Sequence, residues 1–155
     1  MKIYFGIDGG ATSTRAVILD SNGRTLVKEK IDKGTNLKVY QDIAPNRIID
    51  IIMQLCQNIS ISIDDISAFG FGLAAVSHDQ GRELLFKELD RYNIADRSIL
   101  INDAEASYKV SCHDDVGILL TVGTGIIAIA KNSNGEFIRV AGKGHDKADI
   151  GSGYW

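Results

Sequence analysis

An aspartate stands with glycines and hydroxyl residues near the start of the chain, between two apolar runs. Residues 8–14 read Asp-Gly-Gly-Ala-Thr-Ser-Thr, after the apolar run 3–7 and before the apolar run 16–19. Glycines let backbone N–H groups approach an anion, and a carboxylate can orient the water ligands of Mg²⁺. The segment is therefore a candidate phosphate-binding turn, although an ordinary β-hairpin turn has a similar composition. It is not a P-loop, which needs a lysine before its last hydroxyl residue and a helix after it.

A second glycine-rich turn, Gly123-Thr124-Gly125, also separates two apolar runs. Taken alone, it is more typical of a structural turn. As the counterpart of the first turn across a cleft, it would also bind phosphate through its N–H groups and hydroxyl.

A third candidate is Asp103, which follows a short apolar run, residues 98–101, and precedes a helical pattern. We expect it at the carboxyl end of a parallel strand, where open α/β sheets bind ligands. The N-terminus of the following helix would stabilise the carboxylate as an anion. Such an aspartate serves either as a general base for a hydroxyl group or as a helix N-cap.

The elements that would position these residues follow a regular order. Hydrophobic patterns predict both strands and helices. The first predicted helix begins near Pro45, and the second is capped by Asp79. Together they give the order βββαβαβα of an α/β, ribonuclease H-like fold, with parallel strands added through helical crossovers. The predicted strands cover residues 3–7, 16–19, 24–31, 66–75 and 98–101, and the predicted helices cover residues 45–59, 79–92 and 104–112.

After His113 the pattern starts again with three predicted strands, residues 116–122, 126–130 and 137–140. We therefore predict one complete domain, residues 1–113, and the first β-meander of a second, like domain, residues 114–155. A meander alone lacks a helix to cover its open face, so we expect the sequence to be truncated.

Composition limits the function classes. The 155 residues are 45% hydrophobic and carry a formal net charge of −3, which disfavours binding to nucleic acid or to an acidic membrane. Cys56 and Cys112 lie far apart in apolar helical patterns, as expected of thiols in a reducing cytoplasm. The three histidines, His78, His113 and His145, lack metal-ligand spacing and are expected in exposed loops.

The chain resembles the N-acetylglucosamine kinase branch of the sugar kinase, Hsp70 and actin superfamily, also called the BadF/BadG/BcrA/BcrD ATPase family. Four segments carry the resemblance, and a looser fifth match covers residues 142–155, where Lys143 and Ile150 replace the usual Trp and Glu. The four segments are residues 8–14, Gly34-Thr35-Asn36, Asn102-Asp103-Ala104 and residues 121–125.

The resemblance implies an actin-like ATPase fold and an ATP-dependent kinase of a small hexosamine sugar, with ATP and Mg²⁺ as cofactors. It implies that Asp103 is the general base and that Asp8 holds Mg²⁺ through water. Sugar contacts would come from Asn36, Asp103, Thr124 and Asp149. Phosphate contacts would come from Asp8, Gly9, Gly10, Thr12, Ser13, Thr14, Gly123, Thr124 and Gly125.

The family's chains are about twice this length, and their adenosine-binding part has no counterpart here. This chain alone is therefore expected to be inactive. The expected location is cytoplasmic, without membrane or nucleic-acid partners, and the oligomeric state is open, with a homodimer among the alternatives.

Three other functions stay open. Some relatives are ATPases that activate a redox enzyme through an iron–sulfur cluster, but Cys56 and Cys112 lie in unsuitable apolar patterns. A ribonuclease H-type nuclease needs three or four clustered carboxylates, and no third acid accompanies Asp8 and Asp103. A non-catalytic sugar-binding module is the remaining alternative.

Overall fold

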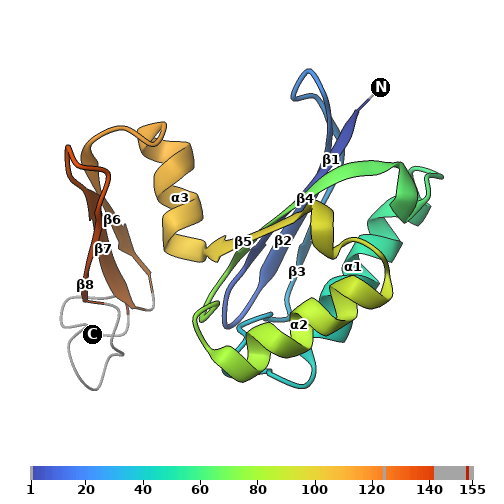
Figure 1. Cartoon of the computed structure of the whole chain (residues 1–155), viewed down its shortest axis with the longest axis horizontal. Helices are drawn as coiled ribbons and strands as arrows, with labels where there is room; N and C mark the ends of the chain where they lie inside the picture. The colour runs from blue at the N-terminus through green and yellow to red at the C-terminus, as the bar shows by residue number, and fades with distance from the viewer. Residues whose placement is uncertain (1, 124, 142–152, 154–155) are drawn as a thin grey trace. The chain divides into compact units, whose positions relative to one another are not determined.

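The chain folds into two compact units, Met1–Asp103 and Ala104–Trp155, each with its own β-sheet. The structure is a computed structural model that describes residues 2–123, 125–141 and 153 (Figure 1). The first unit contains a five-stranded sheet in the order β3-β2-β1-β4-β5, and the second contains a three-stranded sheet in the order β6-β7-β8. Strand order and element order agree with the predicted ribonuclease H-like arrangement.

The first unit alternates strands and helices as the hydrophobic patterns predict. Its elements are β1 (Ile3–Gly9), β2 (Thr14–Asp20), β3 (Thr25–Ile31), α1 (Ala44–Asn58), β4 (Ile66–Leu73), α2 (Asp79–Arg91) and β5 (Ser98–Asn102), with short 3-10 helices at Ile63–Asp65 and Ala95–Arg97.

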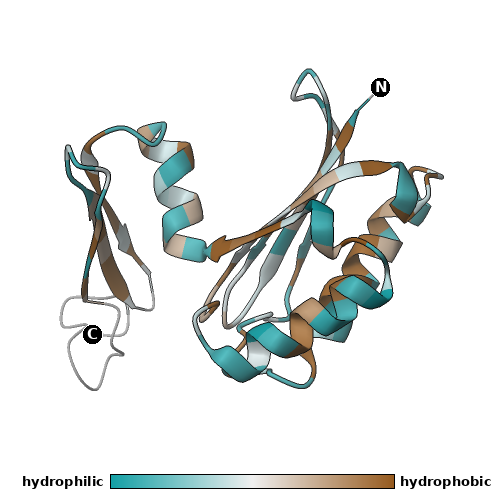
Figure 2. Ribbon diagram, viewed as in Figure 1, coloured by the Kyte–Doolittle hydropathy of each residue, from teal (hydrophilic) through white to brown (hydrophobic). Residues whose placement is uncertain are grey.

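The core of this unit lies between the sheet and the helices α1 and α2, which lie on the same side of it (Figure 1). Alternation along β1 directs Phe5 toward this core, where its ring lies 5.8 Å from that of Phe69. Helix α1 buries residues three and four positions apart, among them Ile48 and Ile52, as its apolar spacing predicts. The side of α2 turned to the viewer in Figure 2 is largely hydrophilic, as expected of a surface helix.

Strand register aligns one edge of the sheet. Strands β1, β4 and β5 are parallel, and the register pairs Gly9 with Leu73 and Leu73 with Asn102. The carboxyl ends of the three strands therefore stop at the same level. The Gly9–Thr14 turn of the β1–β2 hairpin and the segments that follow β4 and β5 therefore all begin at this edge.

The second unit consists of α3 (Asp103–Cys112) from Ala104 onward and a meander of β6 (Gly117–Val122), β7 (Ile126–Lys131) and β8 (Phe137–Ala141). The sequence places the domain boundary after His113, whereas the compact units divide at Asp103. The helix groups with the meander because Tyr108 is fully buried, packs edge-on against Phe137 at 5.4 Å and donates a hydrogen bond to the Asp115 carbonyl at 2.5 Å. The other face of the meander exposes apolar side chains, among them Ile118, Leu120 and Val140.

The helix boundaries confirm the predicted start of α1 and correct the predicted capping residue of α2. Pro45 lies in the first turn of α1, as expected. Helix α2 is capped by His78, not by Asp79, because the Nδ1 atom of His78 accepts the N–H of Gly81 at 3.3 Å. Asp79 is the first helical residue, where its charge still favours the helix dipole. His78 is thus a half-buried capping residue, while His113 is exposed, as predicted.

Candidate functional site

The turn between β1 and β2 is closed by its own hydrogen bonds. The N–H of Gly10 donates to the Ser13 carbonyl at 3.1 Å. The buried hydroxyl of Thr14 donates to the Lys33 carbonyl at 2.8 Å and lies 3.1 Å from the hydroxyl of Thr35. Two groups that the sequence assigns to phosphate binding therefore have partners inside the protein. At the tip of the turn, Thr12 is exposed and Ser13 is half-buried.

Glycine is required in this region for close approach between segments. A Cβ atom on Gly9 would overlap the hydroxyl of Thr35 and crowd Leu73, and one on Gly34 would overlap the Ala11 carbonyl oxygen. The turn and the loop after β3 therefore touch through their backbones.

This loop, residues 32–43, is bonded to the turn at several points. The N–H of Thr35 donates to the Gly10 carbonyl at 2.9 Å, and the hydroxyl of Tyr40 donates to the Ala11 carbonyl at 3.0 Å. Arg47, on α1, donates to the Gly34 carbonyl and lies over the Tyr40 ring, 5.2 Å from its centroid. The loop after β4 joins them, since Ala74 donates to the Gly9 carbonyl at 2.8 Å and accepts the N–H of Leu37 at 3.1 Å.

Asn36 lies in this loop, and the oxygen of its side-chain amide already accepts hydrogen bonds from the backbone. Its Oδ1 atom accepts the N–H groups of Lys38 at 2.9 Å and Val39 at 3.0 Å. From the sequence, we predict that Asn36 offers both a donor and an acceptor to a ligand. The structure uses the acceptor to shape the loop, and within the described residues the Nδ2 donor makes no hydrogen bond.

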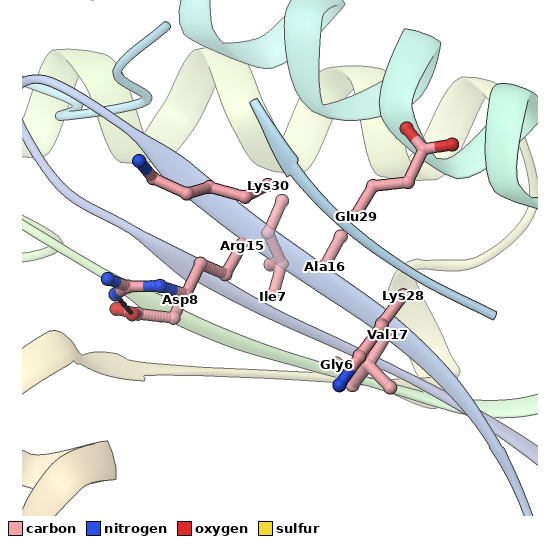
Figure 3. A pocket seen from close by; sticks show the side chains of 9 residues that line it. All are labelled: Gly6, Ile7, Asp8, Arg15, Ala16, Val17, Lys28, Glu29 and Lys30. Carbon is pink, nitrogen blue, oxygen red and sulfur yellow. Dashed lines mark hydrogen bonds and ion pairs between the residues drawn. The ribbon is translucent and has the colours of Figure 1, made fainter. Parts of the chain in front are cut away.

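Asp8 lies near the carboxyl end of β1, with its side chain 56% exposed. It pairs with Arg15, its cross-strand neighbour, at 3.2 Å (Figure 3). Both side chains are mostly solvated, so this ion pair adds little stability, about 0–1 kcal/mol. The exposed carboxylate has room for a hydrated cation, which suits the outer-sphere contact predicted for Mg²⁺. Within the described part of the chain, no cluster of three His, Cys, Asp or Glu residues could hold a metal.

A hollow of about 520 Å³ opens beside Asp8, on the strands β1, β2 and β3 (Figure 3). It includes none of the loop residues near Asn36, nor Asp103. The hollow therefore shares only Asp8 with the candidate site. Its lining residues are Gly6, Ile7, Asp8, Arg15, Ala16, Val17, Lys28, Glu29 and Lys30.

Asp103 follows β5 directly and begins α3, as the sequence predicts, and it is half-buried. The register from Gly9 through Leu73 to Asn102 places it at the same sheet edge as the first turn. The first unit thus collects the Asp8 turn, the Asn36 loop and Asp103 at one edge.

The second glycine turn joins β6 to β7. The N–H of Gly123 donates to the Gly125 carbonyl at 2.8 Å, and its carbonyl accepts the N–H of Gly153 at 2.6 Å. The predictions for Thr124, Lys143, His145, Asp149 and Ile150 lie outside the described residues.

The two thiols lie in different surroundings. Cys56 lies on the buried face of α1, in the core, and burial, with a smaller contribution from Asp65, raises the pKa of its thiol. Cys112 is half-buried at the end of α3.

Comparison with known proteins identifies the family. The model of the BadF/BadG/BcrA/BcrD ATPase family matches residues 5–155. The chain belongs to this family. It is 28% identical to an N-acetylmuramic acid/N-acetylglucosamine kinase of Clostridium acetobutylicum, over 99% of this chain and 50% of that protein. It is 27% identical to an N-acetyl-D-glucosamine kinase of Dictyostelium discoideum, over 99% of this chain and 51% of that protein.

Among solved structures, a protein assigned as an N-acetylglucosamine kinase of Chromobacterium violaceum matches with a TM-score of 0.80 at 22% identity. The match covers 100% of this chain and 54% of that chain, and it supports the fold. This member of the ATPase family thus spans about half the length of the curated relatives that it matches. None of the helices in its described residues is long and apolar enough to cross a membrane.

Sequence reasoning missed Tyr40, which bonds the loop to the turn, and Arg47, which bonds the loop to α1. Tyr40 lies 29 positions from its partner Ala11, and only the folded register brings them together. No sequence motif indicates this contact.

Proposed function

We propose that the protein expressed from the complete gene is an ATP-dependent kinase of a hexosamine, of the N-acetylglucosamine type. The family and the names of the kinase relatives support this proposal. The observation that carries it is the meeting of three segments at one sheet edge. The register of Gly9, Leu73 and Asn102 aligns the Asp8 turn with Asp103, and the hydrogen bond from Thr35 to the Gly10 carbonyl joins the Asn36 loop to the turn.

The first turn would bind the nucleotide phosphates. Gly9 allows the turn to lie against its neighbours, Thr12 and Ser13 carry hydroxyls at the tip, and Thr14 anchors the turn to the loop. Asp8 would hold a water ligand of Mg²⁺, and Mg-ATP would supply the phosphoryl group with its charge neutralised. In the second unit, Gly123, Thr124 and Gly125 are proposed as a further phosphate turn.

The sugar would be held by Asn36, through its Nδ2 donor, and by Asp149 and Thr124. Asp103 would accept the proton of the attacking sugar hydroxyl while the oxygen of that hydroxyl forms a bond to the γ-phosphorus and ADP leaves. Its position as the first residue of α3 places the carboxylate at the helix N-terminus, where a negative charge is favoured.

The burial of Cys56 weighs against activation of a redox partner. A cluster ligand needs a thiolate near the surface, whereas this thiol lies in the core with a raised pKa. Cys112 alone could supply only one ligand per chain to an interfacial cluster.

A coupled ADP-release assay on the complete gene product tests the proposal. The substrates are N-acetylglucosamine, glucosamine, N-acetylmuramic acid and glucose, each with Mg-ATP. We expect turnover that depends on an amino sugar and stops when Mg²⁺ is chelated. Equal ADP release with and without every sugar would overturn the kinase assignment and favour an ATPase.

A further inference from the structure

Two successive carbonyl groups of the first turn are held by the loop after β3. The Gly10 carbonyl accepts the N–H of Thr35 at 2.9 Å, and the Ala11 carbonyl accepts the hydroxyl of Tyr40 at 3.0 Å. Both carbonyl groups therefore point toward the loop. Of these two hydrogen bonds, the one from Thr35 is made by the backbone and the one from Tyr40 by a side chain.

The direction of a carbonyl fixes the direction of the next N–H. A trans peptide is planar, and its C=O and N–H bonds point in opposite directions. The described residues contain no cis peptide bond. The N–H of Ala11, which shares a peptide with the Gly10 carbonyl, and the N–H of Thr12, which shares one with the Ala11 carbonyl, therefore point away from the loop.

These two N–H groups are available to a ligand. Ala11 and Thr12 are exposed, and their N–H groups make no hydrogen bond within the described residues. The N–H of Gly10, by contrast, donates to the Ser13 carbonyl. Two adjacent N–H groups that point to the same side are suited to bind an anion.

Tyr40 is itself fixed in place. Its N–H donates to the Asn36 carbonyl at 3.0 Å, and its carbonyl accepts the N–H groups of Ile43 at 2.8 Å and Ala44 at 2.7 Å, at the start of α1. The guanidinium of Arg47 covers its ring. The hydroxyl thus reaches the turn from a rigid base.

We propose that Tyr40 is a positioning residue for phosphate binding: it fixes the Ala11–Thr12 peptide so that the N–H of Thr12, beside that of Ala11, faces a phosphate of the nucleotide. This inference rests on the proposed function, because it takes the anion to be a phosphate of ATP. Donors oriented in advance bind an anion without the cost of ordering the turn.

The substitution Tyr40→Phe tests this role in the complete gene product. It removes the hydroxyl and keeps the ring under Arg47. Calorimetry should show the Kd for Mg-ATP rising about two- to tenfold, as expected for one lost hydrogen bond. The Kd for N-acetylglucosamine should change less than about twofold, because backbone hydrogen bonds from Thr35, Leu37 and Tyr40 still hold the Asn36 loop.

Tyr92→Phe is the matched control, since Tyr92 is a half-buried tyrosine at the end of α2. It should leave both dissociation constants unchanged. An unchanged Kd for Mg-ATP in Tyr40→Phe would overturn the inference. So would an equal weakening of nucleotide and sugar binding with a lowered Tm, which would indicate general loosening, or the absence of Mg-ATP binding in the unsubstituted protein.

The nucleotide measurement separates this inference from the proposed function. If the unsubstituted protein binds Mg-ATP but phosphorylates none of the sugars, the kinase proposal fails. A selective rise in the Kd for Mg-ATP in Tyr40→Phe would still support the positioning role of Tyr40.

Discussion

The hydroxyl oxygens of Thr14 and Thr35 lie 3.1 Å apart inside the first unit, and neither side chain is exposed. The Thr14 hydroxyl donates its proton to the Lys33 carbonyl, so the hydrogen bond between the two hydroxyls takes its proton from Thr35. The first residue of β2 and the loop after β3 are thus joined through one buried and one partly buried hydrogen bond. These hydrogen bonds fix the candidate phosphate turn against the Asn36 loop.

Replacing Thr14 by Val should lower the free energy of unfolding by about 1–3 kcal/mol, because the Lys33 carbonyl and the Thr35 hydroxyl lose a buried partner. Urea denaturation measures the change. Thr14→Ser keeps the hydroxyl and removes only a methyl group, so it should lose less. Equal losses in the two variants would show that methyl packing, not hydrogen bonding, makes this position sensitive.

Gly34→Ala should separate the turn from the loop, because the new Cβ would overlap the Ala11 carbonyl oxygen. We expect a loss of about 1–3 kcal/mol in the free energy of unfolding and weaker Mg-ATP binding. Gly70→Ala is the control, since a Cβ there would come no closer than 3.8 Å to the Phe5 carbonyl. Unchanged nucleotide affinity in Gly34→Ala would contradict a role for this contact in shaping the site.

The sequence predicts the parts of this protein that depend on local patterns. The spacing of Ile48 and Ile52 predicts α1, and the glycines after Asp8 predict a turn where the structure has one. The prediction of Asp79 as the capping residue of α2 was wrong. His78 and Asp79 both carry acceptors, and only the backbone direction selects His78.

Contacts between distant segments are not visible in such patterns. The turn residue Thr14 carries a hydroxyl, as a phosphate ligand would, yet its partners Lys33 and Thr35 follow from strand register. The grouping of α3 with the meander depends on Tyr108 meeting Phe137, 29 positions later.

The second unit should lose stability in acid through Asp114. Its carboxylate bonds to Lys131 at 3.0 Å and Lys109 at 3.2 Å, and these bonds, that of Lys131 first, hold its pKa below the ordinary value of 3.8. A lowered native pKa stabilises the fold above pH 3.8, and this contribution disappears as the pH falls through the native pKa.

Hydrogen exchange of the β6–β8 amides measures this effect. Asp114→Asn should reduce protection at pH 7 and flatten its dependence on pH below about 4. Asp42→Asn, at an exposed position without an ion pair among the described residues, should keep the dependence of the unsubstituted protein. An unchanged acid profile in Asp114→Asn would contradict the assignment.

The thiol of Cys56 should resist modification in the folded protein, because burial raises its pKa and blocks access. In a Cys112→Ser variant, a disulfide reagent at pH 8 should label Cys56 at least about tenfold more slowly than it labels Cys112 in a Cys56→Ser variant. Urea should bring the two rates together. Rapid labelling of Cys56 without denaturant would show that α1 opens, and it would remove the objection to a role for this thiol as a surface ligand.

The most direct test of the central claim is the turnover of Asp103→Asn in the complete gene product, measured with Mg-ATP and the best amino sugar. The amide has nearly the size of the carboxylate but cannot accept the proton of the sugar hydroxyl. We predict that kcat falls by about 10²–10⁴ while the dissociation constant of Mg-ATP changes less than about twofold. Asp79→Asn, at the exposed first residue of α2, should leave kcat unchanged. A kcat for Asp103→Asn within about threefold of the unsubstituted protein would contradict the assignment of Asp103 as the general base.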